Sequence, residues 1–575
     1  MVSTLDRVLS RTLTRPEEPC TALLMKKTLM TASLWKWGVI GVGVGSLYLL
    51  LVMAAASPAR LTASAPENST MLRSPPQGML ETLTQPPELE PHVVQQVEMF
   101  CGDCHAVPNP SSYARHRWVE GVKRGYEFYA RSGRDDLVPP PPQDTLAYYL
   151  TRAPVEVEFP QPPEPDRPLR TQFRVEKRFV PQEGRLPEIS SMIWAPLQAG
   201  GQPFLIATDM KYGQIVALDP NNAAAAPIVL AHLKHPARIE PVELSGDGST
   251  EFLVADLGSY MPAEEKQGRV VLLRRRPGAQ VFETIVLASD FARVADVRAS
   301  DFDGDGKPDL IVAEFGWQRN GGIWLLRNLG DVQTPLRFSR EQLDARPGTV
   351  HLPVYDFDQD GRDDFAALVS QEYEAVDLFL NRFDRSGPHA AQQHNPFLRL
   401  QSWAGEDLTF GSSGIELTDL NQDGRMDILL TNGDTWDTLH AVPAHGVHWL
   451  ENTGNLDFLH HRLASLPGAY ATAVIDIDND SDLDVIAVAW LPPNAEPEAI
   501  RGGALGSIIC LEQVEPGVFA QHTLETGSPF YSHIVSGDFN HDGRVDFAVA
   551  SGPMVAENRQ EKFYLAIWWN QGTAD

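Results

Sequence analysis

A nine-residue acidic pattern, D-x-D/N-x-D-G/S-x-x-D, recurs along the 575-residue chain and restricts it to a repeat architecture. The five full copies are DFDGDGKPD from Asp301, DFDQDGRDD from Asp356, DLNQDGRMD from Asp419, DIDNDSDLD from Asp476 and DFNHDGRVD from Asp538. A weaker copy, ELSGDGSTE, starts at Glu243, and a copy without acids, APLQAGGQP, starts at Ala195. The starts lie 48 to 63 residues apart, which is close to the spacing of propeller repeats.

The residues around each copy predict four strands per repeat. A short apolar run follows each loop, such as LIVAE after Asp309, and suits a buried strand. A third strand follows, as in GGIWLLRNLG, and then a fourth, as in VFETIVL. Four strands repeated seven times predict an all-β, seven-bladed β-propeller over residues 170–572. The last repeat stops after its third strand, and we expect FRVEKRF, residues 173–179, to supply the fourth, because closing the ring removes two open sheet edges.

These loops, the apolar strand after each loop and turns such as WLENTG resemble the FG-GAP and VCBS repeat family, which includes the integrin α head. The resemblance covers about residues 170–572. It implies a propeller whose loops bind calcium within the blades.

The loop residues point to calcium independently of the resemblance. Oxygen ligands at loop positions 1, 3, 5 and 9, with a main-chain carbonyl at position 7, suit a hard cation, and crowded carboxylates repel one another without one. The predicted metal ligands are Asp301, Asp303, Asp305, Asp309, Asp356, Asp358, Asp360, Asp364, Asp419, Asn421, Asp423, Asp427, Asp476, Asp478, Asp480, Asp484, Asp538, Asn540, Asp542 and Asp546. We therefore expect about five calcium ions, and none in the Ala195 loop.

Turn capping and EF-hands account less well for the acidic loops. Asp residues that only cap turns would explain one such loop, but not five in phase. An EF-hand requires Glu at position 12, where this chain has Val312, Ala367, Leu430, Ala487 and Val549.

The segment Cys101-Gly102-Asp103-Cys104-His105 has the spacing of a covalent haem attachment site. Two thiols at this spacing add to the haem vinyl groups, and the next side chain reaches the iron. With only four cysteines, at positions 20, 101, 104 and 510, the chain has no disulfide scaffold. A redox dithiol leaves His105 unexplained, and a zinc site lacks a second Cys/His pair. Haem c is the predicted cofactor.

The surrounding residues resemble a small class I cytochrome c domain over residues 92–153. PHVVQQVEMF is predicted to form a helix that leads into Cys101, and QDTLAYYLTR a closing helix. The resemblance implies an all-α domain that transfers electrons. It fails on the distal side of the haem, because no Met lies between Met99 and Met192. His92, His116 and an open iron position are the alternatives for the sixth ligand.

The amino-terminal residues predict export. Residues 38–56 carry no charge and follow Lys26, Lys27 and Lys36, which favours a cytoplasmic amino terminus. Three alanines at 54–56 offer a cleavage site, so residues 1–56 form either a cleaved leader or a membrane anchor. Residues 57–91 and 154–169 are Pro-rich linkers. The expected location is the periplasm or the cell surface.

The net charge and the central channel bear on partners. A formal charge of −29 disfavours nucleic acid. Five positions ahead of each loop start, the innermost strands carry Ser190, Arg238, Asp296, His351, Gly414, Ala471 and His533. Arg238, His351 and His533 either meet an anionic or sugar-like ligand or are ordinary residues of a filled channel.

Several functions fit these features, and no nucleophilic or hydrolytic constellation assigns an enzyme class. The first hypothesis is a haem protein that exchanges electrons with a redox partner protein, while the propeller binds a protein or a cell-surface polymer. The alternatives are a periplasmic propeller dehydrogenase that passes electrons to the haem and an adhesin with a haem sensor.

Overall fold

The computed structural model describes residues 89–573 except 104, 163, 164, 166, 179–186, 318, 319, 331–335, 385–392, 406, 437, 502–504, 528, 553–562 and 564. The predicted leader or anchor and most of the first linker lie outside the described residues, as does Cys104. Within the described ranges, no helix is long and apolar enough to span a bilayer.

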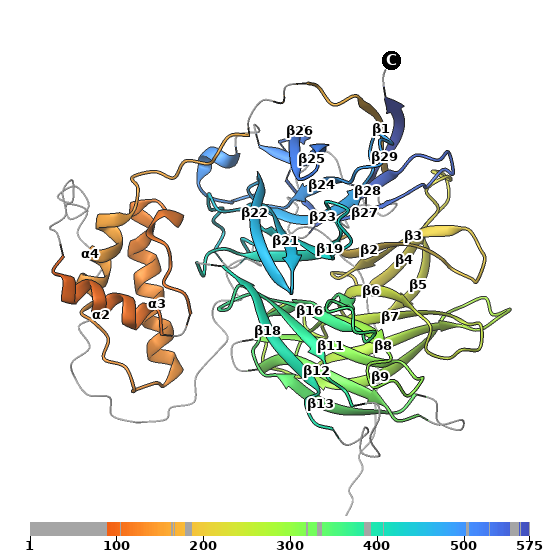
Figure 1. The fold of residues 1–575 in the computed structure, drawn as a ribbon, viewed down its shortest axis with the longest axis horizontal. Coiled ribbons are helices and arrows are strands. Elements are labelled where there is room, and N and C mark those ends of the chain that lie inside the picture. Colours follow the sequence, from red (N-terminus) through yellow and green to blue (C-terminus); the bar gives the residue numbers. More distant parts are fainter. Residues whose placement is uncertain are drawn as a thin grey trace, which may run out of the picture. The chain divides into compact units, whose positions relative to one another are not determined.

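The first described elements are helical (Figure 1). They are α2 (Pro91–Cys101), two 3-10 turns (Pro110–Ser112 and Arg115–Arg117), α3 (Trp118–Ser132) and α4 (Pro142–Arg152). A proline opens α2 and α4, and Gly133 in the left-handed region (φ 71°) ends α3. The three helices share a small core that contains Val97, Trp118 and Tyr149, with the last two rings stacked 3.9 Å apart.

Seven antiparallel sheets follow, one for each predicted repeat. Blade 1 contains β2 (Ile189–Pro196), β3 (Pro203–Asp209), β4 (Gln214–Leu218) and β5 (Ile228–His232). Blade 2 contains β6 (Pro236–Val242), β7 (Thr250–Asp256), β8 (Gly268–Arg275) and β9 (Glu283–Phe291). Blade 3 contains β10 (Val294–Ser300), β11 (Asp309–Trp317), β12 (Asn320–Asn328) and β13 (Phe338–Asp344). Blade 4 has a divided inner strand and contains β14 (Thr349–His351), β15 (Val354–Tyr355), β16 (Asp364–Val369), β17 (Ala375–Asn381) and β18 (Phe397–Ala404).

The last three blades repeat the same strand order. Blade 5 contains β19 (Ser412–Thr418), β20 (Asp427–Asn432), β21 (Gly446–Gly454) and β22 (Asp457–Ser465). Blade 6 contains β23 (Ala469–Ile475), β24 (Asp484–Ala489), β25 (Gly506–Glu515) and β26 (Val518–Thr526). Blade 7 contains β27 (Tyr531–Gly537), β28 (Asp546–Ser551), β29 (Leu565–Thr573) and β1 (Thr171–Arg178), a strand from the other end of the chain.

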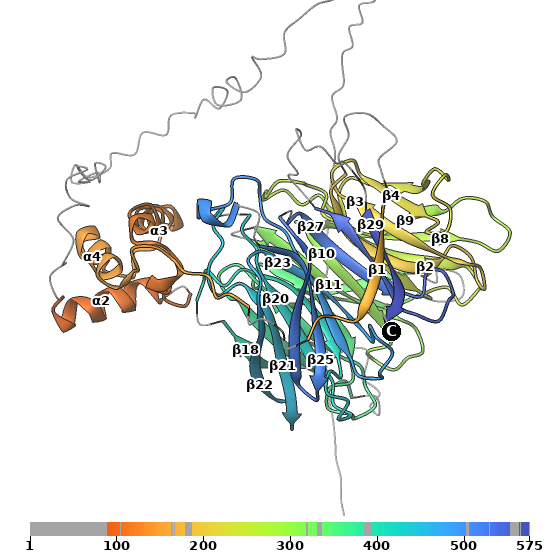
Figure 2. The same cartoon turned by 90° about the horizontal axis from the view of Figure 1, so that it is seen from above.

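The pairing of β1 with β29 closes the ring. The two strands run antiparallel with Val175 opposite Trp568, and Figure 2 shows them side by side. The ring therefore joins two segments that are almost 400 residues apart in the sequence, and no blade is left with three strands.

The hydrophobic core between the blades consists, among the described residues, of seven clusters, one for each pair of neighbouring blades. The cluster between blades 7 and 1, for example, combines Leu205 and Val216 of blade 1 with Ala548 and Ile567 of blade 7. The second strand of each blade is buried on both sides because it lies between two such clusters, as in β16, β20, β24 and β28. The seven-bladed propeller predicted from the sequence is confirmed.

Candidate functional site

The five full acidic loops occupy equivalent places in blades 3 to 7. Each one connects the innermost strand to the second strand, and its ninth residue begins that second strand, as Asp309 begins β11. All five loops therefore lie at the same end of the ring, where the innermost strands end.

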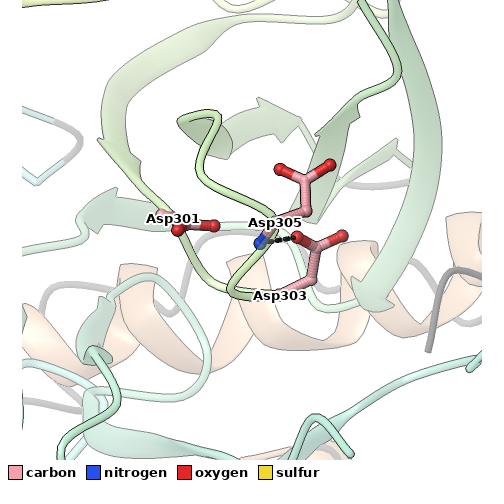
Figure 3. A group of neighbouring side chains, drawn as sticks. All are labelled: Asp301, Asp303 and Asp305. Carbon is pink, nitrogen blue, oxygen red and sulfur yellow. Dashed lines mark hydrogen bonds between the residues drawn. The ribbon is translucent and has the colours of Figure 1, made fainter. Parts of the chain in front are cut away.

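In three of these loops the carboxylates converge on one point. Candidate ligand oxygens lie within 4.8 Å of one another in three groups, Asp301, Asp303 and Asp305; Asp356, Asp358 and Asp360; and Asp476, Asp478 and Asp484. Figure 3 shows the first group on a single turn, where Asp303 accepts a hydrogen bond of 3.2 Å from the Asp305 N–H. Burial, together with the neighbouring carboxylates of Asp305 and Asp301, raises the pKa of Asp303, and a cation among these groups would offset their repulsion.

The main chain of each loop is shaped by its first carboxylate. Asp301 Oδ2 accepts the Gly306 N–H at 3.0 Å, and Asp538 Oδ2 accepts the Gly543 N–H at 2.9 Å. The sixth residue adopts a φ of 79° to 85° in all five loops, which explains the glycine at that position. Ser481 is the exception, with a φ of 79°.

The ninth residue anchors the loop to the blade. Asp364 accepts the N–H groups of Phe357 in its own loop (2.9 Å) and Asn381 in the third strand (2.6 Å). Its counterparts in all five loops are at most 1% exposed.

Burial raises the pKa values of the carboxyl groups at this ninth position. They are raised to about 7 for Asp309 and Asp484, and to about 6 for Asp364, Asp427 and Asp546. The acidic pattern predicted these residues only as ligands and carried no signal for their hydrogen bonds to the main chain.

The other two loops carry an amide at position 3. Asn540 Oδ1 accepts the Asp542 N–H at 3.0 Å and Asn421 Oδ1 accepts the Asp423 N–H at 3.2 Å, as the equivalent carboxylate does in blade 3. The turn is therefore kept while one negative charge is lost, and the amide oxygen remains a suitable ligand for a hard cation.

The donor atoms of these loops fit calcium. Only oxygen ligands are present, and Asp309 Oδ2 and Asp358 Oδ1 are buried carboxylate oxygens for which no described residue is a hydrogen-bond partner. A buried carboxylate oxygen without a donor is costly unless a cation binds it. A basic side chain partly offsets the charge in some loops, as Lys307 does 2.6 Å from Asp305. The Asp476 loop has Asp482 at that position.

The loop of blade 2 is built differently. Glu251, its ninth residue, is buried and accepts the Arg274 Nε–H at 2.6 Å together with the Leu244 N–H at 2.7 Å and the Ser245 N–H at 3.0 Å. The guanidinium of Arg274 thus takes the place of a cation beside this carboxylate. No sequence pattern indicated this pair, because Arg274 lies 23 residues from Glu251 and is brought close only by the pairing of β7 with β8.

The predicted haem-binding residues lie at the end of α2. Cys101 is its last residue, and the Tyr149 hydroxyl hydrogen-bonds the thiol, whose pKa is raised by burial. The Nδ1 atom of His105 lies 2.7 Å from the Ala106 carbonyl oxygen. That contact places the proton on Nδ1 and leaves the lone pair on Nε2, which is the usual arrangement of a metal-binding imidazole. The described part of the motif therefore fits a haem ligand.

The two alternatives for a distal ligand lie in different surroundings. His92 is exposed in the first turn of α2. His116 lines a cavity of about 290 Å³, together with His440 and Glu496 of the propeller.

Two propeller side chains that the sequence did not single out contact the helical segment. Asp407 accepts hydrogen bonds from the Ser112 hydroxyl and, at 3.2 Å, from the Asn109 N–H. His440 Nδ1 lies 3.2 Å from Arg117 Nη2. Both residues stand in loops outside the repeat pattern, so periodicity offered no signal for them.

The innermost strands bring together some of the residues that were predicted to line the central channel. Arg238 Nη1 lies 2.7 Å from His351 Nδ1, and Arg238 Nε lies 3.4 Å from Asp296 Oδ1. The pKa of His533 is lowered to about 3 by burial and by the charge of Arg238. Glu240 and Arg298 also belong to the cluster. The sequence did not single them out, because the prediction covered only the position five residues before each loop, and these two residues lie two positions farther along their strands.

Comparison with known protein families supports the repeat that the sequence predicted. The profile of the FG-GAP-like repeat matches residues 244–312 and 301–367, from blade 2 into blade 4. No curated protein matches the chain in sequence. Two solved structures of virginiamycin B lyase from Staphylococcus aureus are similar at 10% identity and cover 69% of this chain and 99% of theirs. One is a catalytically inactive variant with quinupristin (TM-score 0.40) and the other is selenomethionine-substituted (TM-score 0.39). At these scores the similarity assigns neither fold nor activity.

Proposed function

We propose that this chain is an exported c-type haem protein in which an electron-transfer module is joined to a calcium-stabilised propeller that binds a partner or ligand. The observation that carries the proposal is the coexistence of two groups of candidate ligands with different chemistry. The sequence places two thiols and an imidazole within residues 101–105, and oxygen ligands gather in the propeller loops.

The role of calcium follows from the position of the loops. Each ion would be held by the side chains at positions 1, 3, 5 and 9 of one loop, and position 9 would also tie that loop to the third strand. Five divalent ions would change the formal charge from −29 to −19. Because every ion would bind within one blade, calcium would stabilise the fold and take no part in chemistry.

The role of the helical segment follows from its ligands. Cys101 and Cys104 would hold haem through thioether bonds and His105 would bind the iron, which supplies one-electron transfer when bound. The Tyr149 hydroxyl beside Cys101 and the Trp118 ring stacked on Tyr149 would form one wall of the haem site. A redox partner protein is expected to dock at this segment, and residues 1–56 would direct the chain to the periplasm or the cell surface as a leader or an anchor.

One sample tests both cofactors. We expect purified protein to give the reduced absorption band of a c-type haem and about five calcium ions per chain by elemental analysis. Cys101→Ala is expected to remove covalent attachment and leave the calcium count unchanged. Cys510→Ala, which changes a buried cysteine of β25, is the matched control and keeps both.

Each part of the proposal can fail separately. Wild-type protein without covalent haem after expression with haem-attachment machinery would exclude the electron-transfer module. Protein without calcium would exclude the staple. A stoichiometric organic cofactor extracted from the propeller would favour the dehydrogenase over a binding platform, and a five-coordinate iron that binds carbon monoxide readily would favour the haem sensor.

A further inference from the structure

The channel of the propeller has one charged wall. The seven innermost strands contact one another in a closed ring, β2, β6, β10, β14, β19, β23, β27 and back to β2, so they enclose the channel. Blades 2 and 3 contribute Arg238, Glu240, Asp296 and Arg298, and blade 4 contributes His351. Arg238, Glu240, Arg298 and His351 keep 17% to 22% of their side-chain surface exposed, even though they lie on innermost strands.

These side chains form a lattice in which donors and acceptors alternate. The Arg298 guanidinium lies 2.7 Å from Glu240 and 3.1 Å from Asp296, and that of Arg238 lies 3.1 Å from Glu240. Because a guanidinium can only donate, Arg238 fixes His351 Nδ1 as an acceptor, and the proton of this imidazole is therefore on Nε2. The lattice thus offers an N–H donor beside two paired carboxylates.

The ion-paired groups of the lattice balance in charge, and Glu416 on β19, which interacts with Arg238, adds a carboxyl whose pKa is raised to about 7 by burial. Two guanidinium groups, Arg238 and Arg298, face two carboxylates, Asp296 and Glu240. Burial and the neighbouring charge of Arg238 lower the pKa of His351 to about 3, so this imidazole is neutral. An anion that entered would lose its hydration without meeting an excess of positive charge, whereas a neutral molecule rich in hydroxyl groups can accept from the guanidinium groups of Arg238 and Arg298 and donate to the partly exposed Glu240.

The wall next to His351 is lined by small residues. Blade 5 has Gly414 at the same level and blade 6 has Ala471. A Cβ atom at Gly414 would lie 3.1 Å from Thr431 Oγ1 and 3.2 Å from the Tyr470 carbonyl oxygen, so the backbone of β19 packs closely here and His351 Nε2, 3.8 Å from that Cβ position, faces main chain instead of a bulky side chain. Polar groups on one wall and small side chains on the next suit a bound molecule better than a packed interior.

Aromatic rings gather at the end of the channel opposite the acidic loops. Tyr470, next to Ala471, contacts Trp490 at 5.9 Å between ring centroids, Trp490 contacts Trp436 at 5.8 Å, and Trp436 meets Tyr260 of blade 2 at 6.5 Å. Trp436 and Tyr260 are only half-buried, so part of each ring remains open to a ligand. Rings of this kind stack on the apolar faces of sugars while their polar edges bind water.

We propose that the channel mouth opposite the acidic loops binds a neutral saccharide, held by the lattice around Arg238, Asp296 and His351 and stacked on Trp436 and Tyr260. This inference rests on the proposed role of the propeller as a binding platform and names the chemical class of its ligand. It needs neither haem nor calcium chemistry.

The test is a calorimetric titration of the full-length protein with cellobiose and maltose as neutral probes and glucuronate as the charged one. We expect saturable binding of a neutral probe and none of glucuronate. Trp436→Ala and His351→Phe, which removes the N–H but keeps a ring, should each weaken binding by about tenfold or more. Phe128→Ala changes a 42% exposed ring on α3 and should leave the affinity unchanged.

The outcomes separate the saccharide site from the two cofactor sites. Failure of both neutral probes to bind, tighter binding of glucuronate, or wild-type affinity in Trp436→Ala would overturn the saccharide site. Melting curves of the variants show whether a loss of binding comes from unfolding, and His351→Phe and Trp436→Ala change different blades, so a single folding defect does not decide the result. A missing haem band or calcium count concerns the proposed function alone.

Discussion

Blades 2 and 3 each bury a carboxylate at the same position of the repeat, but the surroundings of the two carboxylates differ. In blade 2 the buried carboxylate of Glu251 is neutralised by the Arg274 guanidinium, 2.6 Å away. In blade 3 the equivalent Asp309 has one oxygen without a hydrogen-bond partner among the described residues, and Asp301, Asp303 and Asp305 gather beside it. From this comparison we propose that a buried carboxylate at this corner of a blade needs a cation, which Arg274 supplies in blade 2 and calcium would supply in blade 3.

Removal of calcium gives the largest expected effect. Chelation should lower the melting temperature of the propeller, because each site contributes about 2.7 kcal/mol at a free calcium concentration 100 times its Kd. Five such sites together would exceed the effect expected of a single substitution. Calorimetry with and without EGTA measures the shift, and an unchanged melting temperature would break the comparison between the two blades.

Replacement of Arg274, the positive charge that the chain itself supplies in blade 2, should cause the next largest loss of stability. Arg274→Met leaves Glu251 buried without its charged partner, and breaking such a pair costs about 3 to 5 kcal/mol. The loss should be the same with calcium and with EGTA, since Arg274 is expected to take the place of the metal in blade 2. Denaturant unfolding in both buffers checks this, and Arg174→Met on β1, whose side chain is largely exposed, is the control with little expected effect.

The two blades also differ in how far the sequence could predict them. The five loops, the buried second strands and the need for a closing strand follow from periodicity, because each repeat places like residues in like environments. The pair Glu251–Arg274 does not, because it depends on strand register within one blade. Glu240 and Arg298 escaped prediction for a related reason, since the loop spacing marks only one level of the channel. Contacts of Asp407 and His440 with the helical segment depend on loops that obey no period.

A single acidic loop should matter less than all five together. Asp301→Ala is expected to lower the calcium content by one ion per chain and to cost up to about 2.7 kcal/mol in calcium-containing buffer. Asp247→Ala, in the acidic loop of blade 2, is the matched control, because its carboxylate is exposed and accepts the N–H of Ser249 within its own loop. Equal calcium loss in both variants would mean that blade 2 also holds an ion.

Acid should weaken the metal sites. The pKa of Asp484 is raised to about 7 by burial, above its ordinary value of 3.8, so the calcium-free folded state holds a proton that the unfolded chain releases between these values. The calcium-free protein should therefore lose stability as pH rises from about 4 to 7, while calcium affinity should fall by up to about tenfold per pH unit below 7 as protons compete. Titration with calcium at pH 5, 6 and 7 tests the second effect. Melting in EGTA over the same range tests the first, and its opposite sign distinguishes proton binding from general acid unfolding.

The smallest expected effect is a gain in stability from a substitution in the blade 6 loop. Ser481 adopts a φ of 79° at the position where the other four full loops have glycine, and the left-handed region costs an ordinary residue about 1 to 2 kcal/mol. Ser481→Gly removes that strain and keeps the main-chain carbonyl that accepts from Gln422 at 2.8 Å, while the extra freedom of glycine in the unfolded chain costs about 0.5 to 1 kcal/mol. A net gain of up to about 1.5 kcal/mol in the free energy of unfolding is expected from these two terms, measured in EGTA so that metal affinity does not enter. Gly306→Ser, the reverse change in blade 3, should lose a similar amount, and a loss in both variants would mean that the serine side chain stabilises its own loop.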